Sequence, residues 1–272
     1  MSSNENEKTL IFLETSIQIA KIFGYPNIKR DQINKILEQN NLVSSTYVLK
    51  EYKLGFVQAA MDFYNIATVS KDIPETIRSS KKFRGREHGK IMDIFSLIME
   101  SMLANQYPKD AQEFKAITLR KLDYFIENYF EREFYKNLQY PLINETACTI
   151  SCLKPKKNLQ IDQWDWDIKP MCNKSTPNNC KIEEFTHKYK DSISNFIIEC
   201  GLKKSKDEET KKRIEAARKI VTKEDLPKGR NCIKLSDWII ALEVPKEAEL
   251  FTLNENHFND TCNILGVKMK TL

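Results

Sequence analysis

The sequence predicts an α/β protein built on a mainly parallel sheet. Short segments of four or five residues that begin with apolar side chains alternate with longer segments that carry helical periodicity, and polar side chains lie at their ends. Strands that alternate with helices are typical of a parallel sheet covered on both faces. The predicted strands lie at 10–13, 42–46 and 250–253. Polar residues at their ends are expected to meet at the carboxyl edge of the sheet, where α/β proteins bind ligands.

Composition sets the broad class of the protein. A chain of 272 residues can bury one good core, and 43 Lys and Arg against 38 Asp and Glu leave a formal charge of +5. This mild excess permits a polyanionic partner without requiring one. The first residues lack the basic and apolar regions of a signal peptide, and no apolar run approaches the roughly 18 residues that span a bilayer. We therefore expect a cytoplasmic protein with no membrane contact, in which most of the seven cysteines are thiols.

The first strand runs directly into an acid. Four apolar residues at 10–13 precede Glu14, and two hydroxyl residues, Thr15 and Ser16, follow it. An acid placed immediately after a buried strand is poorly explained as a surface charge, so Glu14 is a candidate site residue. A short helix follows and ends at Gly24, as helices commonly do at glycine.

A second acid lies early in a long helix. Asp31 is suited to begin a helix that precedes the strand at 42–46, and apolar residues then recur at helical spacing from about 47 to 67. Glu51 lies about one turn into this long helix. Taken alone, it would be read as a solvated charge on a helix surface.

The third acid begins a helix near the C-terminus. Ser236 favours a helix start, and Asp237 lies in the first turn, where exposed N–H groups favour a carboxylate. Pro245 ends that helix, and the strand at 250–253 ends at a polar cluster that contains Asn254.

Together these motifs resemble those of PIN-domain nucleases. In that family an Asp at a helix start is followed by a strand reading Thr-x-Asp or Thr-x-Asn and then a Phe, and here Asp237 precedes Thr252-Leu253-Asn254 and Phe258. The resemblance implies a PIN-like three-layer fold with a central, mainly parallel sheet and an enlarged helical insertion. It implies a single domain over 1–272, with its core at 8–67 and 185–272 and a helical, cysteine-bearing insertion at about 70–184.

The resemblance also implies an activity, namely a metal-dependent endoribonuclease that hydrolyses RNA. Glu14, Glu51 and Asp237 would hold Mg²⁺ or Mn²⁺, and Asn254 would take the fourth catalytic position. Thr15 and Ser236 would orient a carboxylate or water and lie near the nucleic acid.

Two departures from the family pattern keep alternatives open. Glu14 stands where the family has Asp, and Asn254 carries no charge. Two alternatives follow. One is a PIN-like module that binds RNA or protein without cutting, and the other is a DNA-directed nuclease. A homodimer and an inhibitor or antitoxin partner stay open as well.

Basic residues outside these motifs are candidates for contact with nucleic acid. The stretch 78–90 is basic and interrupted by glycine, which predicts a loop, and Lys82, Arg84 and Arg86 in it could grip a phosphate backbone. Arg230 precedes the Asp237 motif and joins these candidates. A solvated loop is the alternative for the stretch.

Four cysteines invite a zinc interpretation. The set comprises Cys148, Cys152, Cys172 and Cys180. Their spacings are unequal and wider than the tight pairs of a zinc knuckle, so ordinary thiols are favoured over Zn²⁺.

Overall fold

The computed structural model describes residues 8–24, 30–83, 85–105, 107–169, 172, 180–202, 208–225 and 229–272. Within these ranges, the side chains of residues 86, 104, 105, 209 and 230 are outside the description. The chain forms a mostly helical α/β structure, so the predicted fold class is confirmed at that level.

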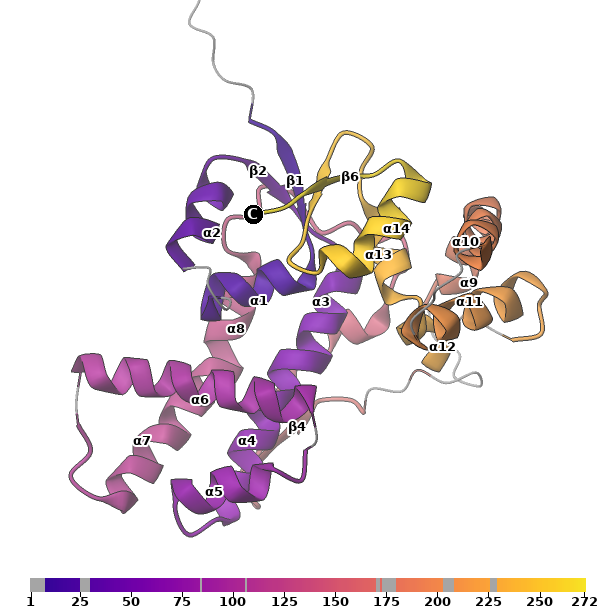
Figure 1. Ribbon diagram of the computed structural model, residues 1–272. Helices are drawn as coiled ribbons and strands as arrows, with labels where there is room; N and C mark the ends of the chain where they lie inside the picture. The colour runs from indigo at the N-terminus through magenta and orange to yellow at the C-terminus, as the bar shows by residue number, and fades with distance from the viewer. Residues whose placement is uncertain are drawn as a thin grey trace, which may run out of the picture.

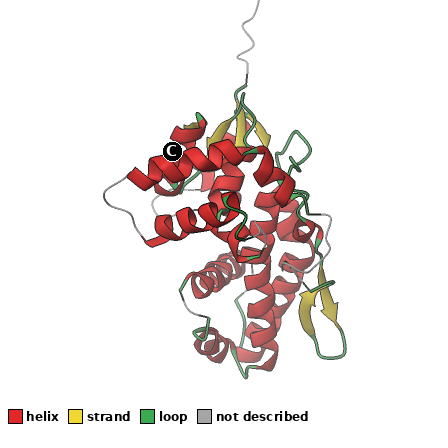
Figure 2. Ribbon diagram, turned by 90° about the vertical axis from the view of Figure 1, so that its right-hand side faces the viewer, coloured by secondary structure: helices red, strands yellow, loops and turns green. Residues whose placement is uncertain are grey.

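A four-stranded parallel sheet occupies one end of the molecule (Figure 1). The strand order is β2-β1-β5-β6, and all three neighbouring pairs are parallel. Their bounds are Leu10–Leu13 for β1, Asn41–Val43 for β2, Glu249–Phe251 for β5 and Lys268–Lys270 for β6. A separate antiparallel hairpin of β3 (Pro155–Asn158) and β4 (Gln163–Trp166) projects from the helical part of the molecule (Figure 2).

The central strand β1 divides the core between the two faces of the sheet. Ile11 and Leu13 pack with Ile17 and other residues of the first two helices, whereas Phe12 belongs to the larger core on the opposite face. Successive side chains of a strand point to opposite faces, and here all three are fully buried. β1 therefore reads as a continuous apolar run, as predicted for a parallel strand covered on both faces.

Helices cover both faces of this sheet. Their bounds are Thr15–Phe23 for α1, Arg30–Glu38 for α2, Thr46–Tyr52 for α3, Ser236–Glu243 for α13 and Glu255–Leu265 for α14. The second strand ends earlier than the predicted 42–46 because Ser45 caps α3. Its hydroxyl accepts a hydrogen bond from the backbone N–H of Val48 at 3.2 Å.

A helical lobe extends away from the sheet (Figure 1). The predicted long helix is continuous, but a π-helical turn, η1 (Lys53–Val57), separates α3 from α4 (Gln58–Val69). The lobe continues through α5 (Ile73–Ser80), α6 (Arg86–Asn105), α7 (Ala111–Tyr124), the π-helical turn η2 (Phe125–Tyr129) and α8 (Phe130–Tyr135). The stretch 78–90 is therefore not a loop throughout, because helices occupy both of its ends.

A second helical group lies beside the C-terminal part of the sheet. After the short 3-10 helix η3 (Thr149–Cys152), it contains α9 (Ile182–Lys188), α10 (Lys190–Leu202), α11 (Glu208–Val221) and α12 (Arg230–Lys234). Helix α11 packs on α10 and α12. Among the described residues, no helix combines the length and the apolar character that crossing a bilayer would require.

Glu243 is a buried acid at the end of α13. Its side chain is 3% exposed, and the hydroxyl of Thr146 donates a hydrogen bond to Oε1 at 3.3 Å. Within the described structure, Oε2 has no hydrogen-bond partner. Burial raises the pKa of this carboxyl from 4.5 to about 7, against the opposing effect of hydrogen bonds from Ser45 and Thr146.

Substituting Glu243→Gln should therefore stabilise the protein in a pH-dependent way. Because the folded pKa lies above the unfolded one, the wild type loses stability as pH rises from 4.5 through 7, whereas the amide does not. The variant should gain up to about 3 kcal/mol relative to wild type between pH 4.5 and pH 8. Urea unfolding at both pH values measures this difference, and an equal effect at the two would contradict it.

Candidate functional site

A cleft of about 810 Å³ opens beside the carboxyl ends of the central strands. β1 and β5 are neighbours in the sheet, so the chain segments that leave them meet at the same edge. The residues predicted for the catalytic centre from three separate motifs all line this cleft: Glu14, Thr15, Glu51, Ser236, Asp237 and Asn254.

The carboxylate of Glu14 is held by three donors. Glu14 is the N-cap of α1, and its Oε2 accepts hydrogen bonds from the backbone N–H of Ser16 at 3.0 Å and from the Ser16 hydroxyl. The Thr252 hydroxyl, at the end of β5, donates to the same oxygen at 3.1 Å. With 4% of its surface exposed, Glu14 is a fixed and buried acid.

Glu51 is tied to the same centre. It lies on α3, and the hydroxyl of Thr15 donates a hydrogen bond to its Oε2 at 2.8 Å. The contact joins the first predicted motif to the second and holds the Thr15 hydroxyl against the Glu51 carboxylate.

Burial raises the pKa values of two acids of the cleft, Glu14 and Glu51. Burial raises the pKa of Glu14 to about 7, where hydrogen bonds from Ser16 oppose the change and the charges of Glu51 and Asp237 add to it. Burial also raises the pKa of Glu51, with Lys50 and the Thr15 hydrogen bond opposing it and Asp237 adding to it. The site thus concentrates negative charge in an enclosed place, which is the condition that attracts a cation.

Asp237 already has a cationic partner, which the sequence did not reveal. Arg213 Nη2 lies 2.5 Å from Asp237 Oδ2, and His257 Nδ1 lies 3.6 Å from the same oxygen. Arg213 Nη1 also donates to the backbone carbonyl of His257 at 3.4 Å. Arg213 comes from α11, a helix that mixes acidic and basic residues, so no local signal distinguished it from its neighbours.

The residues after β5 extend the hydrogen-bond network around Glu14. The backbone N–H of Leu253 donates to the Ser16 hydroxyl at 3.0 Å, and that of Asn254 donates to the Thr252 hydroxyl at 2.9 Å. Thr252 was visible as the first residue of the Thr-x-Asn motif, but its contact with Glu14 follows only from strand pairing.

The side chains at the cleft are of the chemical kind that binds a hard divalent cation. They are not arranged as a metal site requires. Carboxylate and amide oxygens are the ligands that Mg²⁺ and Mn²⁺ prefer. In the described part of the chain, however, no three His, Cys, Asp or Glu side chains are gathered as a metal site requires. Arg213 holds Oδ2 of Asp237, so an ion that binds this oxygen would have to replace the guanidinium group.

The basic residues predicted to contact nucleic acid lie elsewhere or outside the description. Lys82 lines a different cavity, of about 580 Å³, in the helical lobe together with Asp62, Glu75 and Phe83. Arg84 lies outside the described residues, as do the side chains of Arg86 and Arg230.

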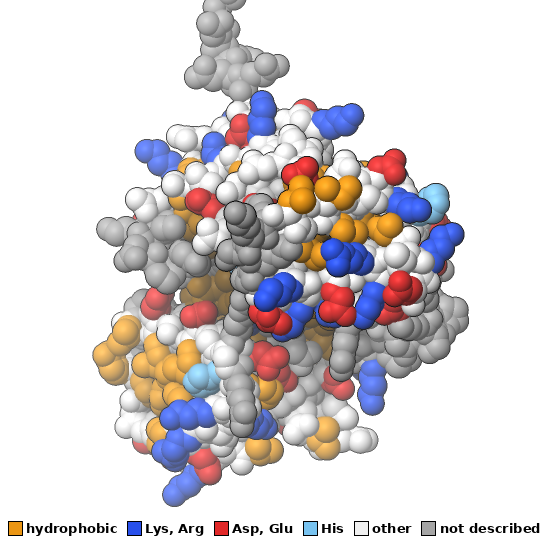
Figure 3. All heavy atoms as spheres, turned by 45° about the vertical axis from the view of Figure 1, so that its right-hand side comes forward, with side chains coloured by type: hydrophobic (Ala, Val, Ile, Leu, Met, Phe, Trp, Pro, Cys, Tyr) orange, Lys and Arg blue, Asp and Glu red, His pale blue; other side chains and the backbone are white. Residues whose placement is uncertain are grey.

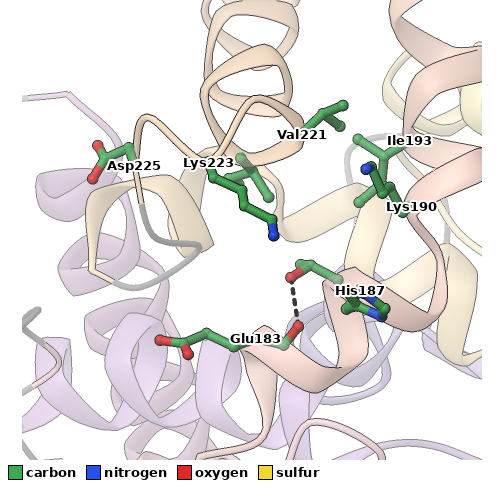
Figure 4. A pocket seen from close by; sticks show the side chains of 9 residues that line it. Glu183, His187, Lys190, Ile193, Val221, Lys223 and Asp225 are labelled. Atoms are coloured by element: carbon green, nitrogen blue, oxygen red, sulfur yellow. Dashed lines mark hydrogen bonds between the residues drawn. The ribbon is translucent and has the colours of Figure 1, made fainter.

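Two further features contain none of the predicted catalytic residues: the cysteines and another pocket. None of the seven cysteines is joined in a disulfide, including Cys148, Cys152, Cys172 and Cys180, and the segment between the last two lies outside the described residues. A pocket of about 240 Å³ between α9, α10 and the end of α11 is lined by residues that include His187 and Lys223 (Figure 4).

No protein-family model matches the chain, and no curated protein or solved structure matches it. The resemblance to PIN-domain nucleases therefore rests on the motifs.

The ion pair of Arg213 should stabilise the metal-free protein. Replacement by Gln would leave Asp237 beside two other acids and should cost about 1–3 kcal/mol of unfolding free energy in EDTA. Lys219→Gln in the same helix is the matched control, because its pair with Glu215 is at 2.7 Å but about half exposed, at 43% and 59%. It should cost at most about 0.5 kcal/mol. Equal losses in urea unfolding would contradict a special role for Arg213.

Proposed function

We propose that the chain is a metal-dependent endoribonuclease with a PIN-like three-layer fold, in which residues 8–67 and 185–272 form the core and about 70–184 an insertion. One observation carries the proposal. Glu14, Glu51 and Asp237 come from three segments far apart in the sequence and line one cleft, where two of them are enclosed and have raised pKa values. A fold gains no stability from enclosing like charges, so their convergence points to a chemical task.

Glu14, Glu51 and Asp237 are the residues that would hold Mg²⁺ or Mn²⁺, with Asn254 beside them. When bound, such an ion would lower the pKa of a water molecule and neutralise charge on the phosphoryl group. The protein's own part is to keep the acids in place. Ser16 and Thr252 hold Glu14, and Thr15 holds Glu51, so these side chains need little reorganisation when substrate arrives.

The position of Arg213 also supports a cation site at the acids, because a positive group already occupies it. A guanidinium group beside Asp237 supplies positive charge to the cluster when no divalent ion is present. Once it leaves Asp237, its planar fork of donors suits phosphate oxygens. Arg213 thus balances the charge of the site before substrate and metal bind.

A binding module without nuclease activity is the second candidate, and the same ion pair favours it. If Arg213 keeps Asp237 permanently, the cleft can hold RNA without needing a metal ion. The contacts of the acids do not distinguish ribose from deoxyribose, so a DNA-directed nuclease is the third candidate.

Cleavage of end-labelled single-stranded RNA and DNA of mixed sequence, with Mn²⁺, Mg²⁺ or EDTA, tests the proposal. We expect metal-dependent cutting of RNA that Asp237→Asn reduces by about a hundredfold or more, since a small loss of alignment has effects of this size. Asp191→Asn, at an exposed position on α10, is the matched control and should cut as wild type does.

Three results would redirect the assignment. Cutting that persists in EDTA, or in the Asp237→Asn variant, would show that the acids do not form the active centre. RNA that is retained without being cut, in a salt-sensitive way by both proteins, would establish the binding module. DNA cut in preference to RNA would change the substrate.

A further inference from the structure

We propose that three lysines around the cleft hold the phosphate backbone of a single-stranded nucleic acid across the acids. These residues, the lysine rim, are Lys90, Lys212 and Lys234. The inference rests on the proposed function because it concerns the same cleft, but it concerns binding and requires neither metal nor cutting.

The lysine rim is assembled from three elements outside the sheet. Lys90 belongs to α6 of the helical lobe, Lys212 to α11 and Lys234 to α12. Figure 1 shows α6 below the sheet, at the top of the lobe, and α11 and α12 to the right, so positive charge reaches the cleft from two directions. Basic and acidic side chains also alternate across the middle of the face that Figure 3 shows.

Gly55 lies close to the amine of Lys90. Gly55 lies in the π-helical turn that follows the helix of Glu51. A methyl group built on its Cα would lie 2.8 Å from Lys90 Nζ, which is closer than such atoms approach. The backbone conformation at this position does not demand glycine, and glycine is less favourable than alanine inside a helix. The amine ends a flexible side chain and could move aside, so Gly55 leaves room for Lys90 Nζ in its present place without being required by it.

The chemistry of the rim suits a nucleic-acid strand of any sequence. Lysine is a flexible point charge that binds phosphate without reading bases, so the rim provides backbone contacts. Ile233, which is 62% exposed, and Ile19 also line the cleft and offer apolar surface to a base or a ribose.

The size of the cleft favours a single strand. Its volume of about 810 Å³ is that of a cavity for a small ligand, enough for a few nucleotides. A duplex is a rigid rod that would lie across the opening, whereas an unpaired strand can bend in and place its backbone beside the acids.

A binding experiment tests the lysine rim. Fluorescein-labelled single-stranded RNA of mixed sequence is titrated with the protein in EDTA at several salt concentrations, and binding is followed by fluorescence anisotropy. Lys90→Gln and Lys234→Gln should each weaken binding about three- to tenfold and reduce the slope of log affinity against log salt by about 0.7. Lys156→Gln, which removes the same charge from an exposed position on β3, is the matched control and should bind as wild type does.

The variant Gly55→Ala separates the effect of where the Lys90 amine lies from the effect of its charge. It leaves the net charge unchanged and favours the helix, but it displaces the amine of Lys90 from its place in the cleft. We expect weaker binding, in the same direction as Lys90→Gln, with an unchanged circular dichroism spectrum. Lys90→Arg, which keeps the charge, should retain most of the affinity.

Two outcomes would overturn the rim. One is that the Lys90, Lys234 and Gly55 variants all bind as Lys156→Gln does. The other is that a duplex of the same sequence binds more tightly than the single strand. Since no metal is present in this assay, the rim can hold even if the cleavage experiment fails, and it can fail even if cutting is observed.

Discussion

The pairing of β1 with β5 is the contact on which the whole site depends. Leu13 lies opposite Phe251, and the backbone N–H of Glu14 donates to the carbonyl of Phe251 at 3.3 Å, just past the end of the ladder. This register places Glu14 beside Thr252, although nearly the whole chain separates them. A slip of one residue in either strand would turn the side chain at its end to the opposite face and so separate Glu14 from Thr252. The buried apolar residues of β1 hold the register, so the core specifies the geometry of the acids.

Enclosing several acids in one place has a cost that the surroundings partly offset. The hydroxyls of Thr15, Ser16 and Thr252 favour the ionised carboxylates, and Arg213 adds a full positive charge beside Asp237. Burial outweighs the hydrogen bonds at Glu14, which is why its pKa is raised to about 7. The cluster therefore lowers the stability of the protein at neutral pH, and sites that perform chemistry commonly carry such a cost.

The local sequence pattern predicted the strands and helices that depend on neighbouring residues. It did not predict contacts between segments that are distant in the sequence. The strand before Glu14 and the long helix of Glu51 follow from runs and periodicity, and both are present. The end of the second strand was misplaced because Ser45 serves α3 as a cap. Arg213 could not be identified, since its helix carries many alternating charges and only tertiary packing selects the one that meets Asp237.

The π-helical turn at Lys53–Val57 has a geometric consequence for the long helix that contains it. Such a turn accommodates one extra residue, and each residue of an α-helix advances the chain by about 100° around the axis. The part before the turn carries Glu51 and packs on α1 and α13, and the part after it packs in the helical lobe. The inserted residue thus acts as a phase shift between the two halves. Without it, a straight helix that kept its lobe contacts would rotate Glu51 away from the cleft.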